Sequence, residues 1–186
     1  MPVIALGAVF SAYGVLALLC YFPGGLLADR YPARRLLVAA LVLTALGGVH
    51  LLTMPGLAQL MIVFALFGVT TVLLFWAALI RAVREWGEAS RQGRAFGLLD
   101  GGRGLFSAAL ATLAWLALGA AFTGDPAAAS DAERLVALRS VFVVYIAATL
   151  IAAGLVWLLV PETPIVTAAR TDAAARRRVL ASPMLW

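Results

Sequence analysis

The chain has 186 residues, of which 64% are hydrophobic and only 12% are charged, with a mean hydropathy of +1.02. Soluble domains are roughly 45–50% apolar and 25% charged, so this composition excludes an ordinary soluble protein. The net charge of +5 comes from arginines that are spread along the chain and form no patch with aromatic residues. We therefore expect a membrane protein, and no nucleic-acid partner.

Four stretches contain no Asp, Glu, Lys or Arg, namely 3–28, 36–80, 104–124 and 140–161. A helix of about 20 apolar residues crosses the hydrocarbon core, and the second stretch is long enough to cross twice. Pro55 and Gly56 divide that stretch, because both residues end helices and favour turns. The sequence predicts an all-α polytopic membrane bundle over residues 1–160, with five spans at about 3–27, 36–53, 57–82, 94–122 and 137–160.

The connections between these spans alternate in charge. Those at 29–35 and 81–94 and the tail after 160 are rich in arginine, whereas 53–56 is uncharged and 123–136 is mainly acidic. The positive-inside rule places the arginine-rich connections and the tail in the cytoplasm, and the N-terminus of the chain outside. The expected location is the plasma membrane, which in a bacterium is the inner membrane.

The two ends of the sequence suggest that the chain is a fragment. The N-terminus lacks the basic region of a cleaved signal peptide, and its apolar run has the length of a span. Residues 161–186 form a basic linker that turns apolar at its end, as before a further span. We expect one span to be missing before Met1 and an unknown length after Trp186. A genuine five-span protein remains the alternative.

The segment GGLLADRYPARRLL, residues 24–37, resembles the cytoplasmic signature between the second and third helices of the major facilitator superfamily. Pro32 and Ala33 depart from that pattern, and the matching residues are Gly25, Leu27, Ala28, Asp29, Arg30, Arg34 and Arg35. REWGEASRQGRAFGLLDGGRGL, 84–105, is similar to the loop between helices four and five, and PET, 161–163, to the end of helix six. The resemblance implies an incomplete N-terminal six-helix half of that fold, with helices two to six present.

The resemblance also implies a cytoplasmic charge cluster that holds the two halves of the transporter in the outward-facing state. Glu85 would be its acidic partner on helix four, because it follows Arg81 by four residues and shares its helix face. The residues assigned to this cluster are Asp29, Arg30, Arg34, Arg35, Arg81, Glu85 and Arg94. From the residues alone, Asp29 and Arg30 can also be explained as a stop signal that fixes topology.

The segment GRAFGLLDGGRG, 93–104, carries two patterns. Glycines every four residues allow close approach of another helix, and they are Gly93, Gly97 and Gly101. Asp100, Arg103 and Ser107 share one face, with Arg103 about 10–15 Å inside the membrane. Two interpretations stay open for Arg103: it pairs with Asp100 or with the charge cluster, or it binds an anionic solute while Asp100 orients it.

Because helices one, two, four and five line the cavity in this family, the resemblance makes Tyr13, Phe75 and Trp76 candidate wall residues. It implies a secondary active transporter of a small solute that works by alternating access. The segment 84–105 also resembles branches that move organic anions and sugar phosphates. The helix-five Gly-Pro signature of antiporters is absent, which favours a uniporter or a symporter.

The alternative is a truncated, non-transporting membrane protein or an accessory subunit that needs a partner. An intramembrane enzyme is disfavoured, because no nucleophile or metal-ligand set occurs at one depth. We expect no cofactor and no metal. The expected partners are the lipid bilayer, a small solute and the missing second half of the transporter.

Overall fold

The computed structural model of the chain describes residues 3–87, 90–120 and 129–162, and these residues form helices joined by short turns. In chain order the helices are α1 (Val3–Arg30), α2 (Ala33–Leu51), α3 (Leu57–Gly68), η1 (Val69–Trp76), α4 (Ala77–Gly87), α5 (Gln92–Ala120) and α6 (Asp131–Leu159). The segments α3, η1 and α4 follow one another without a break, as one helical rod whose middle part is π-helical. The described part of the chain thus holds 5 helical rods that are long and apolar enough to span a membrane, and the predicted all-α class is confirmed.

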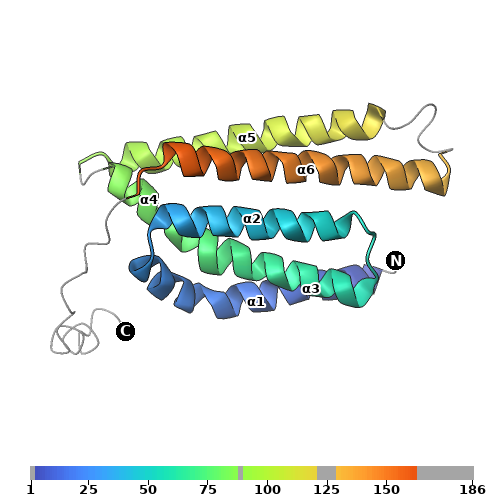
Figure 1. Cartoon of the computed structure of the whole chain (residues 1–186), viewed down its shortest axis with the longest axis horizontal. Coiled ribbons are helices and arrows are strands. Elements are labelled where there is room, and N and C mark those ends of the chain that lie inside the picture. The colour runs from blue at the N-terminus through green and yellow to red at the C-terminus, as the bar shows by residue number, and fades with distance from the viewer. Residues whose placement is uncertain (1–2, 88–89, 121–128, 163–186) are drawn as a thin grey trace.

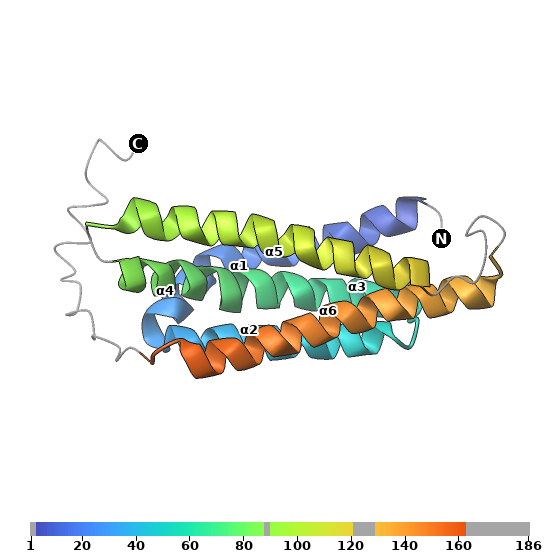
Figure 2. The ribbon, with the colours of Figure 1, turned by 90° about the horizontal axis from the view of Figure 1, so that it is seen from above.

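The five rods run along a common axis and lie side by side (Figures 1 and 2). α1 packs against α3 and η1, α2 lies against both η1 and α6, and α5 contacts α6 and α4. The last turns of α1, α4 and α6 and the first turns of α2 and α5 meet at one end of the bundle (Figure 1). We call this end the basic end, because Arg30, Arg34, Arg35, Arg81 and Arg94 lie there.

Local sequence signals explain where the helices begin and end. α1 ends at Arg30 because Pro32 follows closely, and Pro32 is the N-cap residue of α2. α6 begins with a capping box, in which the Glu133 amide donates to Ser130 Oγ at 3.3 Å and the Ser130 amide donates to Glu133 Oε2 at 2.8 Å. This cap starts α6 at Asp131, six positions before the predicted 137.

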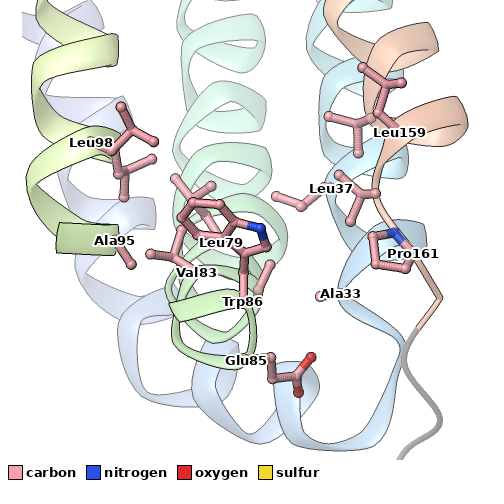
Figure 3. Close-up of a pocket in the computed structure, with 14 residues that line it drawn as sticks. Ala33, Leu37, Leu79, Val83, Glu85, Trp86, Ala95, Leu98, Leu159 and Pro161 are labelled. Atoms are coloured by element: carbon pink, nitrogen blue, oxygen red, sulfur yellow. The ribbon is translucent and has the colours of Figure 1, made fainter. Parts of the chain in front are cut away.

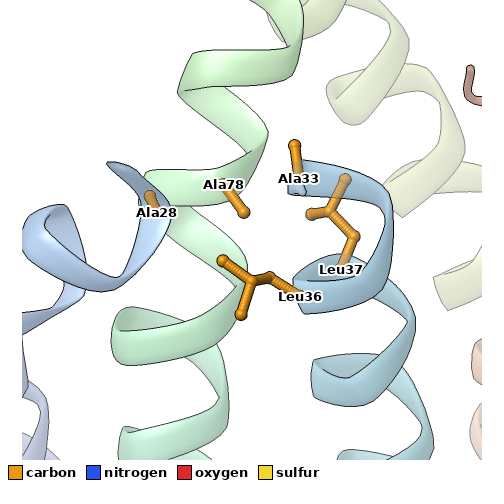
Figure 4. Packing of buried hydrophobic residues seen from close by; sticks show 5 residues of the cluster. All are labelled: Ala28, Ala33, Leu36, Leu37 and Ala78. Carbon is orange, nitrogen blue, oxygen red and sulfur yellow. The ribbon is translucent and has the colours of Figure 1, made fainter. Parts of the chain in front are cut away.

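Close contact between α1 and the α3–η1 rod depends on glycine. A Cβ atom added to Gly68 would lie 2.5 Å from the carbonyl oxygen of Tyr13, and one added to Gly24 would lie 3.0 Å from that of Val72. Small residues let helix backbones approach in this way in membrane bundles. The packing continues at the basic end in a cluster from three helices (Figure 4), formed by Ala28, Ala33, Leu36, Leu37 and Ala78.

Large apolar side chains cover much of the outside of the bundle. Leu18, Phe22 and Leu158 are each more than 75% exposed. A soluble monomer rarely exposes contiguous surface of this kind, whereas a bilayer solvates it. α5 and α6 are the clearest cases, because among the described residues of each only two are buried, Ala95 and Ala114 in α5 and Ala137 and Ala153 in α6.

Candidate functional site

The first cluster of charges at the basic end joins α2 to the chain just beyond α6. The Arg34 guanidinium donates from Nη2 to Glu162 Oε2 at 2.5 Å, and Arg35 Nε lies 2.6 Å from Glu162 Oε1. The Arg34 guanidinium also lies 4.8 Å from the centre of the Trp157 ring. Partial desolvation alone would raise the pKa of Glu162, but the hydrogen bonds from Arg34 and Arg35 outweigh it and hold that pKa below its usual value of 4.5.

The second cluster joins α4 to α1. Arg81 Nε lies 2.6 Å from Glu85 Oε1, as the spacing of four residues predicts. Arg81 Nη1 also donates to the carbonyl oxygen of Ala28 in the last turn of α1. That carbonyl is at a helix C-terminus, where a cation is favoured by the helix dipole. Arg81 thus fixes the ends of two helices relative to each other.

The structure divides the predicted charge cluster between these two sets. Arg34 and Arg35 pair with Glu162, a residue that the sequence reasoning did not assign, although the PET segment that contains it was recognised. Asp29, Arg30 and Arg94 are exposed, and within the described ranges they form no ion pair. These three charged side chains therefore face outward at the surface of the basic end.

A polar groove of about 320 Å³ lies between α1 and the η1–α4 segment. Asp29 and Gly25 line it from α1, and Trp76, Arg81 and Arg84 line it from the other side. The carboxylate of Asp29, the guanidinium of Arg84 and the indole of Trp76 thus line the same groove. Its residues include three of those predicted from the sequence as gating or cavity-wall residues, Asp29, Arg81 and Trp76.

A larger and mostly apolar cavity of about 480 Å³ opens at the basic end between α2, α4, α5 and α6 (Figure 3). Trp86, Leu98 and Leu159 contribute much of its lining, and Glu85 is its charged member. None of the residues predicted to contact the solute lies in it. Its position among four helix ends indicates loose packing there.

The predicted face of α5 lies opposite η1. The Arg103 guanidinium carbon is 5.4 Å from the centre of the Trp76 ring, and Arg103 Nη1 lies 3.8 Å from Asp100 Oδ1. The side chains of Arg103 and Asp100 are 54% and 72% exposed, and Ser107 is exposed one turn further along. On insertion scales a charged residue at the centre of a spanning helix costs about 2.5–3.5 kcal/mol, so this pair should face protein or water.

The glycine stripe of α5 has no partner among the described residues. A Cβ added to Gly93, Gly97 or Gly101 would meet nothing within 4 Å. The predicted close helix contact at this stripe is therefore not made by α1–α4 or α6. It stays a prediction for a further helix.

The two other predicted wall residues lie in surroundings different from that of Trp76. Tyr13 lines a separate pocket of about 310 Å³ together with Phe10, Phe64 and Thr44. Phe75 packs against the buried cluster at the basic end. Tyr13, Phe75 and Trp76 therefore do not share one cavity wall within the described part of the chain.

The described residues contain no group of three or more His, Cys, Asp or Glu side chains that could hold a metal ion. Cys20, the single cysteine of the sequence, is buried in α1. The charged residues that converge are arginines and carboxylates, which bind polar groups and each other. The charged groups that converge at the basic end therefore form arginine–carboxylate ion pairs.

Five membrane-length helices with arginine–carboxylate clusters at one end and a charged pair inside a span describe a polytopic membrane protein. The family model of the Major Facilitator Superfamily matches residues 1–186, and the chain belongs to this family of membrane transporters. No solved structure matches the chain.

Two curated relatives come from Escherichia coli (strain K12). The inner membrane protein YqcE is 32% identical over 100 residues, which are 54% of this chain and 24% of that protein. The inner membrane protein YihN is 34% identical over 119 residues, which are 61% of this chain and 28% of that protein. The matched part thus spans about a quarter of each relative.

Proposed function

We propose that the chain is part of a secondary active transporter that moves a small solute across the bacterial inner membrane by alternating access. The family match over residues 1–186 carries this proposal. The names of both relatives, which are inner membrane proteins, support the location in the inner membrane. The absence of a Gly-Pro signature on α5 favours a uniporter or a symporter over an antiporter.

The charge clusters of the basic end suggest how such a transporter would open and close. Ion pairs between side chains that stay partly exposed can break and re-form while helices move, whereas a packed apolar core resists such motion. Asp29 lies in the polar groove beside Arg81 but is not paired with it. We infer that Asp29 and Arg81 close the cytoplasmic side together with the second half of the transporter.

The proposal includes that second half, because the solute site of an alternating-access transporter lies between two bundles. The matched part covers about a quarter of the relatives. The unpartnered glycines of α5 supply a surface on which a further helix can pack. In the competing function, that of an accessory subunit, the same surface would bind a separate protein.

The test starts with the DNA on both sides of this reading frame, which should encode one more span before Met1 and about six after Trp186. The complete product is then reconstituted into vesicles, and uptake of radiolabelled hexose, hexose 6-phosphate and succinate is measured with and without an ion gradient. We expect gradient-dependent uptake of one solute class, and loss of most of it in Asp29→Asn. Clean start and stop signals around the frame, with no uptake by the chain, would instead support the accessory subunit.

A further inference from the structure

The Arg103 side chain lies inside the membrane-length part of α5 but is only partly covered by protein. It is about 16 Å from the first residue of its helix at 1.5 Å per residue, and α5 itself contains 29 residues. Its side chain is nevertheless 54% exposed. Since a guanidinium in the hydrocarbon core is strongly disfavoured, this exposed surface should meet water or a polar partner.

The contacts of Arg103 leave its hydrogen-bonding edge unused. The guanidinium carbon lies 5.4 Å from the centre of the Trp76 ring, a cation–π contact with a partner that accepts no conventional hydrogen bond. The N–H donors point outward around the rim of a guanidinium, in a fork that matches a carboxylate or a phosphate. Among the described residues, none accepts a hydrogen bond from Arg103. Trp76 therefore holds the cation in place without occupying its donors.

The ion pair with Asp100 does not satisfy those donors. Arg103 Nη1 and Asp100 Oδ1 are 3.8 Å apart, which is beyond hydrogen-bond distance, and the Asp100 side chain is 72% exposed. By contrast, the Arg34 and Arg81 guanidiniums approach their carboxylates to 2.5 Å and 2.6 Å. Asp100 thus lies near the cation and restricts its orientation, but leaves room for a second anion.

Space and access agree with such an anion. An added Cβ at Gly101 or Gly104, on either side of Arg103, would meet nothing within 4 Å. Trp76, the ring beneath the guanidinium, also lines the polar groove that carries Arg81 and Arg84 at the basic end. Trp76 thus contacts Arg103 and also lines the groove in which Arg81 and Arg84 lie.

We propose that Arg103, supported by Trp76, binds the anionic group of the transported solute, a carboxylate, phosphate or sulfate, and that the groove with Arg84 leads to it. This inference rests on the proposed transport function and names its substrate class. The shared chemistry could also be that of a lipid phosphate. The depth of Arg103 in α5 favours the solute.

The test measures the electrostatic preference of this face in the complete protein. In a Cys20→Ser background, Ser107→Cys places a thiol one turn from Arg103 on the same face, about 6 Å away. Reaction rates are compared for the anionic reagent methanethiosulfonate ethylsulfonate and its cationic trimethylammonium counterpart, each normalised to its rate with a free thiol. We expect the anionic reagent to be favoured about tenfold, the ratio that one unit charge about 6 Å away gives between two reagents of opposite charge in water.

Matched variants assign the preference to Arg103. Arg103→Gln should abolish it, and Asp100→Asn should increase it. Arg94→Gln should leave the preference unchanged. Arg94 lies about 20 Å from position 107 along the same helix, which is more than two Debye lengths.

Succinate or inorganic phosphate in the bath should slow the reaction of the thiol with the anionic reagent. Vesicles of zwitterionic lipid should give the same preference as vesicles with anionic lipid, whereas dependence on lipid charge would identify a headgroup site and overturn the solute assignment.

Two further results would also overturn the proposal. One is a thiol at position 107 that reacts with neither reagent, which would mean that this face is buried. The other is equal normalised rates with Arg103 present, which would mean that Asp100 neutralises it. Neither depends on the uptake assay, so a wrong substrate class is distinguishable from a chain that does not transport.

Discussion

Glu162 shows how one side chain can connect two helices that are distant in sequence. Its two carboxylate oxygens accept from Arg34 and Arg35 separately, and Arg34 also lies over Trp157 of α6. The start of α2 and the end of α6 are thereby held at the same level of the basic end. The sequence spacing of Arg81 and Glu85 predicts their pairing, whereas 128 positions separate Arg34 from Glu162 and no local pattern relates them.

The link through Glu162 should depend on pH. Its pKa in the folded protein is below the usual value of 4.5, so its stabilising effect is complete above pH 4.5 and is lost as the pH falls through the lowered pKa. In a variant with Trp157 as its sole tryptophan, we expect constant fluorescence emission from pH 8 to pH 5 and a change only below pH 4.5. Glu162→Gln should show the low-pH emission throughout, and a wild-type pH profile in that variant would contradict the assignment.

The helices themselves are largely predictable from the sequence, because charge-free runs fix the spans and Pro32, Pro55 and Gly56 fix their limits. The ends that were misplaced depend on finer signals. α5 begins at Gln92 rather than 94, and α6 begins at Asp131 through its capping box. The π-helical segment η1 was not predicted, because its apolar sequence VTTVLLFW is equally compatible with a regular α-helix.

A hydrogen bond between elements lies near the start of this π-helical segment. Thr70 is fully buried in η1, and its hydroxyl oxygen lies 2.9 Å from that of Thr44 in α2. Interhelical hydrogen bonds in membranes contribute about 0.6 kcal/mol on average and about 1.7 kcal/mol at most. We expect a coupling energy in that range from a double-mutant cycle of Thr44→Val and Thr70→Val, measured by unfolding in detergent. A coupling near zero would show that the contact does not hold α2 to η1.

Glycine packing gives a second prediction for the elements. Gly68→Ala should lower stability by about 1–3 kcal/mol, because its new methyl group would meet the backbone of Tyr13. Gly97→Ala adds the same group to α5 where nothing lies within 4 Å, so in residues 1–186 alone, without the proposed further helix, it should be neutral or stabilise the chain by up to about 1 kcal/mol. Thermal unfolding of both variants measures the difference. Equal losses would mean that Gly97 also faces a packed helix.

The bundle as a whole is incompletely covered on the side of α5. Charged and small residues share this exposed helix, among them Arg103, Asp100 and Gly97. A lipid-facing helix would carry large apolar residues throughout, as most of α6 does. The composition of α5 therefore suits a surface that meets another bundle or an aqueous cavity. The sequence patterns place these charged and small residues together on α5. They could not show that Trp76 lies opposite Arg103, since that contact depends on how α5 and η1 pack.

The orientation of the whole bundle follows from its charge asymmetry and can be tested directly. Arginines gather at the basic end, while the turn between α2 and α3 at the other end carries no charge. The positive-inside rule then predicts that the basic end lies in the cytoplasm.

Cysteine labelling tests this orientation. In the Cys20→Ser background, Thr53→Cys in the turn between α2 and α3 should react with an impermeant maleimide from outside intact cells. Ser90→Cys, exposed between α4 and α5, should react only after permeabilisation. The background chain without cysteine controls for nonspecific labelling, and the reverse pattern would invert the topology and move the gating clusters to the external face.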